Sequence, residues 1–554
     1  MLDEIKEINV AELAADALEA AEDAGEFDFR ETWRAVRTAV SPLAVAQESV
    51  VLGAELIKIA VGTSEIEPEK RDWRFKDDAW HSNGFYKRLG QSYLALCKCA
   101  KRVVNDDADW RTRERAKFAL EVTTSALAPT NTLLGNPAAL KKAFDTNGKS
   151  LVRGMKNFAS DVRHNGGMPS MVDSSPFEKG ENIAATPGSV VFRNDVLELL
   201  QYTPQTEEVY AIPTLLIPPQ INKYYFTDLA PGRSLVEYAV QQGVQMYVVS
   251  WRNPHQDQGD WDLDTYVSAL LEAIDAINSI TGRKKLNTIG FCAGGITMSA
   301  LLSYMAATND KRVNAISYAV TLLDWSTPSM MGMLHSKKLI NHARNKSRRK
   351  GIISGQDLGS VFAWFRPNEL VWNYWVNNYL MGEAPPSFDI LAWNADSTNL
   401  PASLHAQFLD IFMDNSMRVP GEIQVLGEAV DLSKITADAF VVGAIDDHLT
   451  PWKGCYETTQ LLGSSSTFVL SNAGHIAALV NPPGNPKASY LAGPEPGADP
   501  VEWLDSAGKH SGSWWEHWSG WVGERSGDRI DAPTSPGNKQ FPELDPAPGT
   551  YIHG

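Results

Sequence analysis

Cysteine is scarce in this chain: the 554 residues include four, at positions 97, 99, 292 and 455. A content this low argues against a disulfide framework and is typical of proteins that fold in a reducing compartment. The sequence also lacks the His-Glu-x-x-His and paired Cys-x-x-Cys patterns of common metal sites. We therefore expect no metal and no bound redox cofactor, and we assign Cys97 and Cys99, on a predicted helix, to packing.

Long hydrophobic runs are missing as well, because no apolar stretch approaches the roughly 18 to 20 residues that span a bilayer. The start of the chain, Met-Leu-Asp-Glu-Ile-Lys-Glu, lacks the basic residues and the apolar run of a secretory signal. The mean hydropathy of −0.24 is that of an ordinary globular protein. We expect a cytoplasmic protein with no transmembrane segment.

Basic residues are outnumbered, with 50 Lys and Arg against 67 Asp and Glu, and the net charge is −17 at pH 7. A field of that sign repels a phosphate backbone, so nucleic acid is not an expected partner. Acidic residues are dense among alanines and leucines over residues 1–30, where we predict a solvated helix or a partly ordered arm.

The length allows two to four domains at about 150 residues per domain. Apolar residues recur at helical spacing over residues 29–161, and a turn-rich stretch follows. Short β-branched runs then alternate with amphipathic segments, except between residues 325 and 432. We predict a mostly helical N-terminal domain over 1–175 and an α/β domain over 176–554, with an inserted cap at about 325–432.

Four β-branched runs are the predicted strands that open the second domain: residues 190–192, 214–217, 246–249 and 286–289. Between the last two, apolar residues from Val267 to Ile277 form a helical stripe, and Gly282 suits the left-handed residue that ends a helix. A later helical stripe, which we assign to the core, consists of four tryptophans: Trp514, Trp515, Trp518 and Trp521.

The most informative segment is residues 290–295, Gly-Phe-Cys-Ala-Gly-Gly, which follows a predicted strand and precedes an apolar helix. This is the context of a nucleophile elbow, a sharp turn in which glycines on either side of Cys292 leave room for neighbouring backbone. A helix N-terminus behind a thiol also favours the reactive thiolate. The alternative is that Cys292 is a small buried hydrophobe in a glycine-rich turn.

An acid and a histidine follow in the order that an α/β-hydrolase fold requires. Asp447 comes just after the predicted strand that ends at Ala444, and His475 follows the predicted strand at 467–470. Each residue alone has an ordinary explanation, since Asp forms turns and a lone His is usually structural. Together and in order, they predict a Cys292, Asp447, His475 catalytic triad.

Beyond the elbow, short segments match one known family: Pro-Pro-Gln-Ile-Asn-Lys (218–223), Ser-Trp-Arg-Asn-Pro (250–254), Arg-Pro-Asn (366–368), Trp-Asn-Tyr (372–374), Trp-Asn (393–394) and Asn-Pro-Pro (481–483). The chain resembles the poly(3-hydroxyalkanoate) synthases, which polymerise 3-hydroxyacyl-CoA into polyester granules. The resemblance covers nearly the whole second half and extends weakly into the first, in Pro-Thr-Asn (129–131) and Asn-Gly-Gly-Met-Pro (165–169).

The resemblance implies an α/β-hydrolase fold catalytic domain with an inserted cap, preceded by a mostly α-helical N-terminal domain. It also implies a homodimer of the single-subunit branch, located in the cytoplasm on polyhydroxyalkanoate granules, with granule-associated proteins as further partners. Carried over by motif, Cys292 is the nucleophile, Asp447 the acid and His475 the base. The preference for short-chain or medium-chain monomers stays open.

The acyl-transfer chemistry needs two donors for a tetrahedral oxyanion. One is the backbone N–H of Ala293, directly after the nucleophile. The second is expected in the loop after the strand at 214–217, where two prolines cannot donate, so Ile221 or Gln220 is predicted.

Coenzyme A carries phosphates, so a cation is expected near the cap. Arg366 lies in a segment that matches the family and is the predicted contact. A basic run between residues 337 and 350 is the alternative, although such runs usually form a solvated face. His448 either lines the same channel or helps to hold Asp447.

Three functions are compatible with these features. The first is polymerisation of (R)-3-hydroxyacyl-CoA with release of CoA, through a cysteine thioester. The second is an acyl-CoA thioesterase or hydrolase on the same fold, in which water takes the acyl group. The third is a non-enzymatic granule coat, which the ordered Cys, Asp and His disfavour because a coat needs no triad. The extent of the resemblance favours the first.

Overall fold

The computed structural model describes residues 36–105 and 107–554, so the predicted acidic helix over residues 1–30 lies outside the described residues. The chain forms two compact units. The first comprises residues 1–173, 330–343 and 357–388, and the second comprises the remainder. In the described part of the chain, no helix is both long and apolar enough to cross a membrane.

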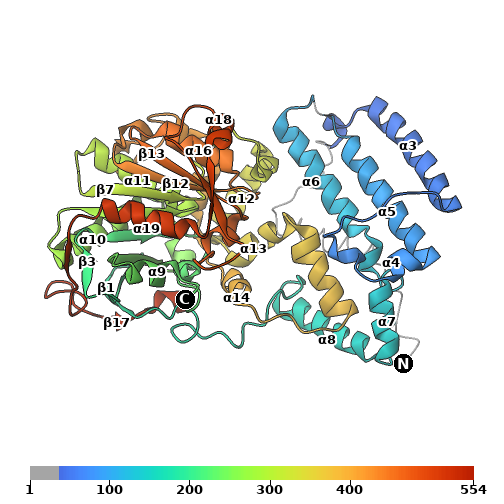
Figure 1. The fold of residues 1–554 in the computed structure, drawn as a ribbon, viewed down its shortest axis with the longest axis horizontal. Coiled ribbons are helices and arrows are strands. Elements are labelled where there is room, and N and C mark those ends of the chain that lie inside the picture. Colours follow the sequence, from blue (N-terminus) through green and yellow to red (C-terminus); the bar gives the residue numbers. More distant parts are fainter. Residues whose placement is uncertain (1–35, 106) are drawn as a thin grey trace. The chain divides into compact units, whose positions relative to one another are not determined.

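The first unit is helical, as its apolar spacing predicts. Its main helices are α3 (Pro42–Val61), α4 (Ala79–Ser82), α5 (Gly84–Arg102), α6 (Trp110–Ala126), α7 (Pro137–Asp145) and α8 (Lys149–His164). Helices α3, α5 and α6 lie side by side (Figure 1). Asparagine and aspartate side chains begin two of them: Asn83 accepts from the Phe85 and Tyr86 amides, and Asp109 caps α6.

Two segments of the predicted cap pack within this helical unit. They include the π-helical turns η6 (Asn368–Trp372) and η7 (Trp375–Leu380). Helix α8 approaches η7 so closely that a Cβ on Gly154 would lie 1.8 Å from the carbonyl oxygen of Tyr379. The Tyr379 hydroxyl also donates to Asp161 at 2.7 Å. The bounds of the domains and of the cap stay predictions.

The second unit is built on a mixed sheet of eleven strands in the order β15-β14-β13-β12-β7-β6-β4-β5-β2-β1-β17. The strands from β13 to β5 in that order are parallel, and those outside them pair antiparallel. The strand bounds are β1 (Gly188–Arg193), β2 (Leu197–Tyr202), β4 (Thr214–Ile217), β5 (Met246–Trp251), β6 (Leu286–Phe291), β7 (Val313–Ala319), β12 (Asp438–Ala444), β13 (Ser466–Ser471), β14 (Ser489–Ala492), β15 (Gly508–Ser511) and β17 (Asp545–Pro546).

Helices connect the parallel strands, as the predicted alternation requires. They are α9 (Leu235–Gln241), α10 (Leu263–Thr281), α11 (Ala293–Ala307) and α16 (Trp452–Leu461). Helices α17 (His475–Leu479), α18 (Pro500–Ser506) and α19 (Trp514–Glu524) follow the last parallel strand. Gly282 ends α10 with a φ of 65°, which confirms its predicted left-handed cap. The α/β prediction is therefore confirmed. Helices α12 (Lys337–Lys350), α13 (Gly355–Trp364), α14 (Asp389–Ala395) and α15 (Ala402–Asp414) lie in the stretch predicted as the cap.

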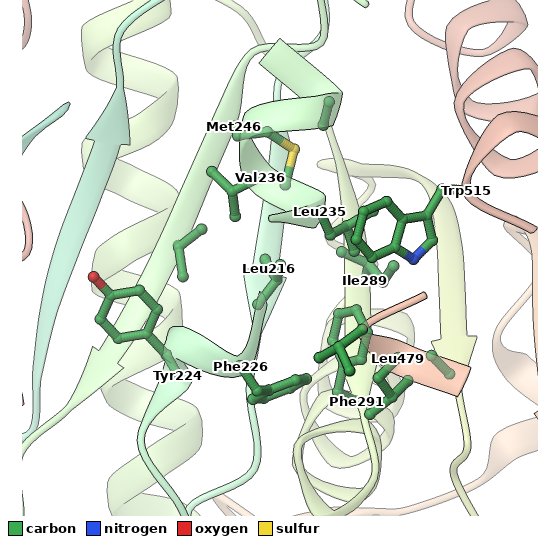
Figure 2. Packing of buried hydrophobic residues seen from close by; sticks show 14 of the residues in the cluster. Leu216, Tyr224, Phe226, Leu235, Val236, Met246, Ile289, Phe291, Leu479 and Trp515 are labelled. Atoms are coloured by element: carbon green, nitrogen blue, oxygen red, sulfur yellow. The ribbon is translucent and has the colours of Figure 1, made fainter. Parts of the chain in front are cut away.

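One face of the sheet packs against α9 and α19. Leu216 of β4 and Ile289 and Phe291 of the neighbouring β6 belong to a cluster that also contains Val236 of α9 and Trp515 of α19 (Figure 2). Each of these side chains is at most 1% exposed. The four tryptophans predicted to be core residues are all buried, which confirms that interpretation. This packing fixes the strand ends from which the candidate site is built.

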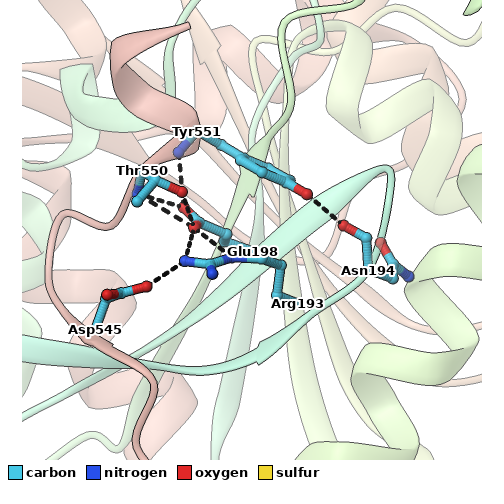
Figure 3. Close-up of polar contacts among 6 residues, drawn as sticks. All are labelled: Arg193, Asn194, Glu198, Asp545, Thr550 and Tyr551. Atoms are coloured by element: carbon cyan, nitrogen blue, oxygen red, sulfur yellow. Dashed lines mark hydrogen bonds and ion pairs between the residues drawn. The ribbon is translucent and has the colours of Figure 1, made fainter.

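The proline- and glycine-rich tail is anchored to β2 by a buried carboxylate. Glu198, whose side chain is fully buried, accepts hydrogen bonds from the Thr550 hydroxyl at 2.7 Å and the Tyr551 amide at 2.9 Å (Figure 3). The Arg193 guanidinium donates to the same carboxylate at 2.8 Å and also pairs with Asp545. Through these contacts Glu198 connects β2 to the C-terminal segment.

Glu198→Ala is expected to lower the free energy of unfolding by about 1–3 kcal/mol, because Thr550 and Tyr551 lose their acceptor and Arg193 keeps only Asp545. Urea unfolding followed by tryptophan fluorescence measures the change. The matched control is Asp195→Ala, since that carboxylate is 95% exposed and lies 3.9 Å from Arg252. The control is expected to change stability by less than about 1 kcal/mol. Equal stabilities for the two variants would contradict the anchoring role.

Candidate active site

Cys292 lies in a sharp turn between β6 and α11. Its backbone φ is 48° and its ψ is −121°, a conformation that residues other than glycine rarely adopt. The Cys292 amide donates to the Ala319 carbonyl oxygen at 3.0 Å. Strained residues of this kind persist where the surrounding structure holds them, and they gather at functional sites. The thiol is partly exposed at the N-terminus of α11, whereas most of that helix is buried.

The glycines of this turn are required by close contacts between backbones. A Cβ on Gly290 would lie 2.8 Å from the Cα of Gly295, and one on Gly294 would lie 2.4 Å from the Ile217 carbonyl oxygen. Real Cβ atoms do not approach backbone so closely, so alanine does not fit at either position without a backbone shift. The expected reason for the glycines, steric room around an elbow, is confirmed.

Asp447 and His475 meet beyond the ends of neighbouring parallel strands. Asp447 follows β12 and His475 begins α17 after β13, and the His475 Nδ1 lies 2.6 Å from the Asp447 Oδ2. Both residues are buried, with 6% and 7% of their surfaces exposed. The structure therefore brings together the two residues that sequence order alone had connected.

The charges of this pair are strongly coupled. Burial lowers the pKa of His475, but the carboxylate of Asp447 and hydrogen bonding to Asp447 and Cys292 outweigh it and raise the pKa to about 10. Burial alone would raise the pKa of Asp447. The positive charge of His475 and the hydrogen bonds from His475 and Thr450 outweigh burial and lower that pKa below its ordinary value. Since Cys292 contributes to the pKa of His475, its side chain lies within interaction range of the imidazole.

The loop after β4 lies against the start of α11. Gln220 donates from its Nε2 to the Thr297 hydroxyl at 2.9 Å, one turn beyond Ala293. Thr398 fixes the same loop from the other side, since its hydroxyl donates to the Gln220 carbonyl oxygen at 2.6 Å and its amide to that of Ile221 at 3.2 Å. The roles of Ala293 and Ile221 as oxyanion donors stay predictions.

The two residues predicted to bind substrate lie in different surroundings. Arg366 belongs to the first unit, is exposed, and pairs with Glu369 three residues further on. His448 is half-buried and adjacent in sequence to Asp447. Their roles in substrate binding stay predictions. Among the residues that the structure describes, no group of His, Cys, Asp and Glu is arranged to hold a metal ion.

Sequence reasoning missed Thr450, which contacts both Asp447 and His475. Its hydroxyl lies 2.6 Å from the Asp447 Oδ2 and 3.1 Å from the His475 Nδ1. The signal in the sequence was the spacing Asp-x-x-Thr, in which an Asp carboxylate accepts from the backbone amide three residues later. That amide lies 2.9 Å from the Asp447 Oδ1.

Comparison with known families defines the class first. Residues 213–482 match the family described as the alpha/beta hydrolase fold, which confirms the predicted fold class. Residues 71–239 match the family described as the poly-beta-hydroxybutyrate polymerase (PhaC) N-terminus.

Proteins that are similar to this chain over most of its length then identify the particular family. The chain is 45% identical to poly(3-hydroxyalkanoate) polymerase 1 of Ectopseudomonas oleovorans over 92% of both chains. It is 46% identical to polymerase 2 of that organism, over 92% of this chain and 91% of the relative. It is 37% identical to the poly(3-hydroxyalkanoate) polymerase subunit PhaC of Cupriavidus necator, over 89% of this chain and 85% of the relative. The chain belongs to the poly(3-hydroxyalkanoate) polymerase family.

Gly294→Ala is expected to destabilise the elbow, because its Cβ would lie within 2.5 Å of the carbonyl oxygens of Ile217 and Pro218. We expect a loss of at least about 1–3 kcal/mol in the free energy of unfolding, measured by urea titration.

Gly520→Ala is the matched control, because this helical glycine in α19 has open space around it. That variant is expected to be unchanged or up to about 1 kcal/mol more stable. A Gly294→Ala protein as stable as wild type would show that the elbow tolerates a side chain there.

Proposed function

We propose that this chain polymerises (R)-3-hydroxyacyl-CoA into polyester and releases CoA, with Cys292 carrying the acyl group as a thioester. Membership in the poly(3-hydroxyalkanoate) polymerase family supports the overall reaction. The observation that carries the mechanism is the thiol at the elbow beside a buried His475 and Asp447, which lie 2.6 Å apart. The thioesterase and granule-coat alternatives are not favoured, because the relatives that match most of the chain are named polymerases.

In the first half-reaction, the sulfur of Cys292 attacks the thioester carbonyl of the substrate. His475 takes the thiol proton, and Asp447 holds the imidazole and balances its charge. Since the Nδ1 of His475 faces Asp447, its Nε2 is the nitrogen that exchanges protons. Collapse of the tetrahedral intermediate breaks the bond to CoA, and the proton on His475 passes to the departing CoA sulfur.

In the second half-reaction, the 3-hydroxyl of another acyl unit attacks an acyl thioester. His475 accepts the hydroxyl proton as the new ester bond forms, and the same proton then returns to the thiolate that leaves. One acid–base pair therefore serves both half-reactions. Because one thioester is exchanged for another in the first step, the acyl group stays activated until the ester bond is made.

The oxyanion that forms in each step needs donors that are fixed before the reaction. The backbone amide of Ala293 is the first donor in this proposal, and that of Ile221 is the second. The contacts of Gln220 and Thr398 support this choice, because they hold the loop after β4 on both sides.

Substrate binding and assembly follow from the family. We assign Arg366 and His448 to the binding of the CoA thioester, with Arg366 directed at phosphate. The protein acts as a homodimer on polyhydroxyalkanoate granules in the cytoplasm, where granule-associated proteins are its partners. No metal or redox cofactor enters the scheme, because thioester exchange needs neither an electron carrier nor a Lewis acid beyond the oxyanion donors.

Cys292→Ala is expected to abolish CoA release from (R)-3-hydroxybutyryl-CoA and (R)-3-hydroxyoctanoyl-CoA, because no acyl carrier remains. Release is followed with a thiol reagent, and the product is sized by chromatography after extraction. The wild-type protein is expected to yield polymer from at least one substrate, and the better substrate gives the chain-length class.

Cys99→Ala is the control, because it removes a thiol from helix α5 of the first unit and leaves the elbow intact. It is expected to retain wild-type activity. Free hydroxy acid as the sole product would make the protein a thioesterase, and unchanged release by Cys292→Ala would exclude this nucleophile.

A further inference from the structure

Thr450 lies at the end of the turn that carries Asp447 and touches both members of the acid–base pair. Its Oγ1 is 2.6 Å from the Asp447 Oδ2 and 3.1 Å from the His475 Nδ1. The residue is 5% exposed, so water does not replace these contacts. Neither half-reaction described above assigns a role to this hydroxyl.

The hydroxyl has one proton, and its neighbours decide where that proton goes. Asp447 is an acceptor only when ionised, so the Thr450 O–H donates to the Oδ2. The Thr450 oxygen is then left with lone pairs facing the His475 Nδ1. Both neighbours of this nitrogen are therefore acceptors, which requires Nδ1 to carry a proton in the neutral and in the charged imidazole.

The same residue fixes the direction of the carboxylate. The Oδ1 of Asp447 accepts from the backbone amides of Leu449 and Thr450, each at 2.9 Å. The Oδ2 accepts from the Thr450 hydroxyl and from His475. With both oxygens held, the carboxylate cannot rotate its Oδ2 away from the imidazole without losing a charge-assisted hydrogen bond.

The turn is also supported from behind. The thiol of Cys455, which is fully buried in α16, donates to the Thr450 carbonyl oxygen at 3.5 Å. Helix α16 begins with Trp452, two residues after Thr450, and Pro451 is its N-cap. Thr450 is therefore placed by the helix that follows it as well as by the groups that it contacts.

We propose that Thr450 is a positioning residue for the acid–base pair: its hydroxyl aligns Asp447 and keeps the proton of His475 on Nδ1, so that Nε2 faces the nucleophile. The proposal rests on the proposed function for what the pair does. In acylation, Nε2 takes the thiol proton and returns it to the CoA sulfur. In elongation, it takes the proton of the 3-hydroxyl. Nδ1 keeps its proton throughout both steps.

The test compares Thr450→Val, which keeps the shape but removes the hydroxyl, with Thr450→Ser, which keeps the hydroxyl. For CoA release, kcat is expected to fall about 10- to 100-fold in the valine variant, the loss typical of a hydrogen bond to a charged group. The KM for acyl-CoA is expected to change less than about twofold, because the hydroxyl is engaged by Asp447 and His475. The serine variant is expected to recover most of the rate.

Thr458→Val is the matched control, because it makes the same substitution eight residues further on, in helix α16. Thr458 is fully buried, and its hydroxyl has no partner among the described residues. This variant is expected to retain the wild-type kcat and to be at least as stable. Wild-type kcat in Thr450→Val, or a folded Thr450→Ser that is no faster than the valine variant, would overturn the proposal.

A second readout needs no acyl-CoA and separates this proposal from the proposed function. Iodoacetamide alkylation of Cys292 is followed at neutral pH by mass spectrometry of the peptide that contains it. The rate is expected to fall in Thr450→Val and to return in Thr450→Ser, because His475 must be correctly placed to take the thiol proton. Equal alkylation rates in wild type and Thr450→Val would overturn the positioning role. Wild-type protein that fails to make polymer yet shows the expected order of alkylation rates would contradict the proposed function alone.

Discussion

The whole site depends on two close approaches around Cys292. Strand β6 lies against the start of helix α11, and the start of α11 lies against the end of β4. The absence of side chains at Gly290 and Gly294 brings backbones within distances that a Cβ would not tolerate. This approach forces Cys292 into its unusual backbone conformation and leaves the thiol at the start of a helix. The parallel order of β6, β7, β12 and β13 then places Cys292, Asp447 and His475 at the same edge of the sheet.

The second constraint is the burial of an ionic pair. A carboxylate without water is costly unless its lone pairs are filled, and Asp447 meets this need with two backbone amides, a hydroxyl and an imidazole. The carboxylate is thereby kept charged and aligned with the imidazole, while the thiol beside the pair stays partly accessible. Such an arrangement suits a site in which a large acyl group reaches the thiol from solvent, while protons are transferred by the buried His475.

Local patterns made much of this predictable. The strand-elbow-helix sequence around Cys292 is local, and Asp447 and His475 each come directly after a run that predicts a strand, so adjacent residues pointed to the candidate centre. The strand positions and the cap at Gly282 also followed from local spacing. Arg366 shows the limit of this reasoning, since its i, i+3 spacing favours an ion pair with Glu369 but gives no sign of a contact with phosphate.

What could not be predicted depends on contacts between distant parts of the chain. The packing of η7 against α8 joins residues more than two hundred positions apart, and no local pattern in either segment indicates the other. The same holds for Glu198, a charged residue in a fully buried strand, whose partners lie in the C-terminal tail. Thr450 was hidden for a different reason, because its hydroxyl has a role only once β12 and β13 bring His475 beside Asp447.

The central claim is that a thioester on Cys292 is the intermediate, and rapid quenching tests it most directly. Protein mixed with (R)-3-hydroxybutyryl-CoA is denatured in acid within the first turnovers and digested. The masses of its peptides are then measured by mass spectrometry. The account predicts a hydroxyacyl adduct on the peptide that contains Cys292, present in wild type and strongly reduced in His475→Gln. CoA release with no adduct at Cys292, or with an adduct on another residue, would contradict it.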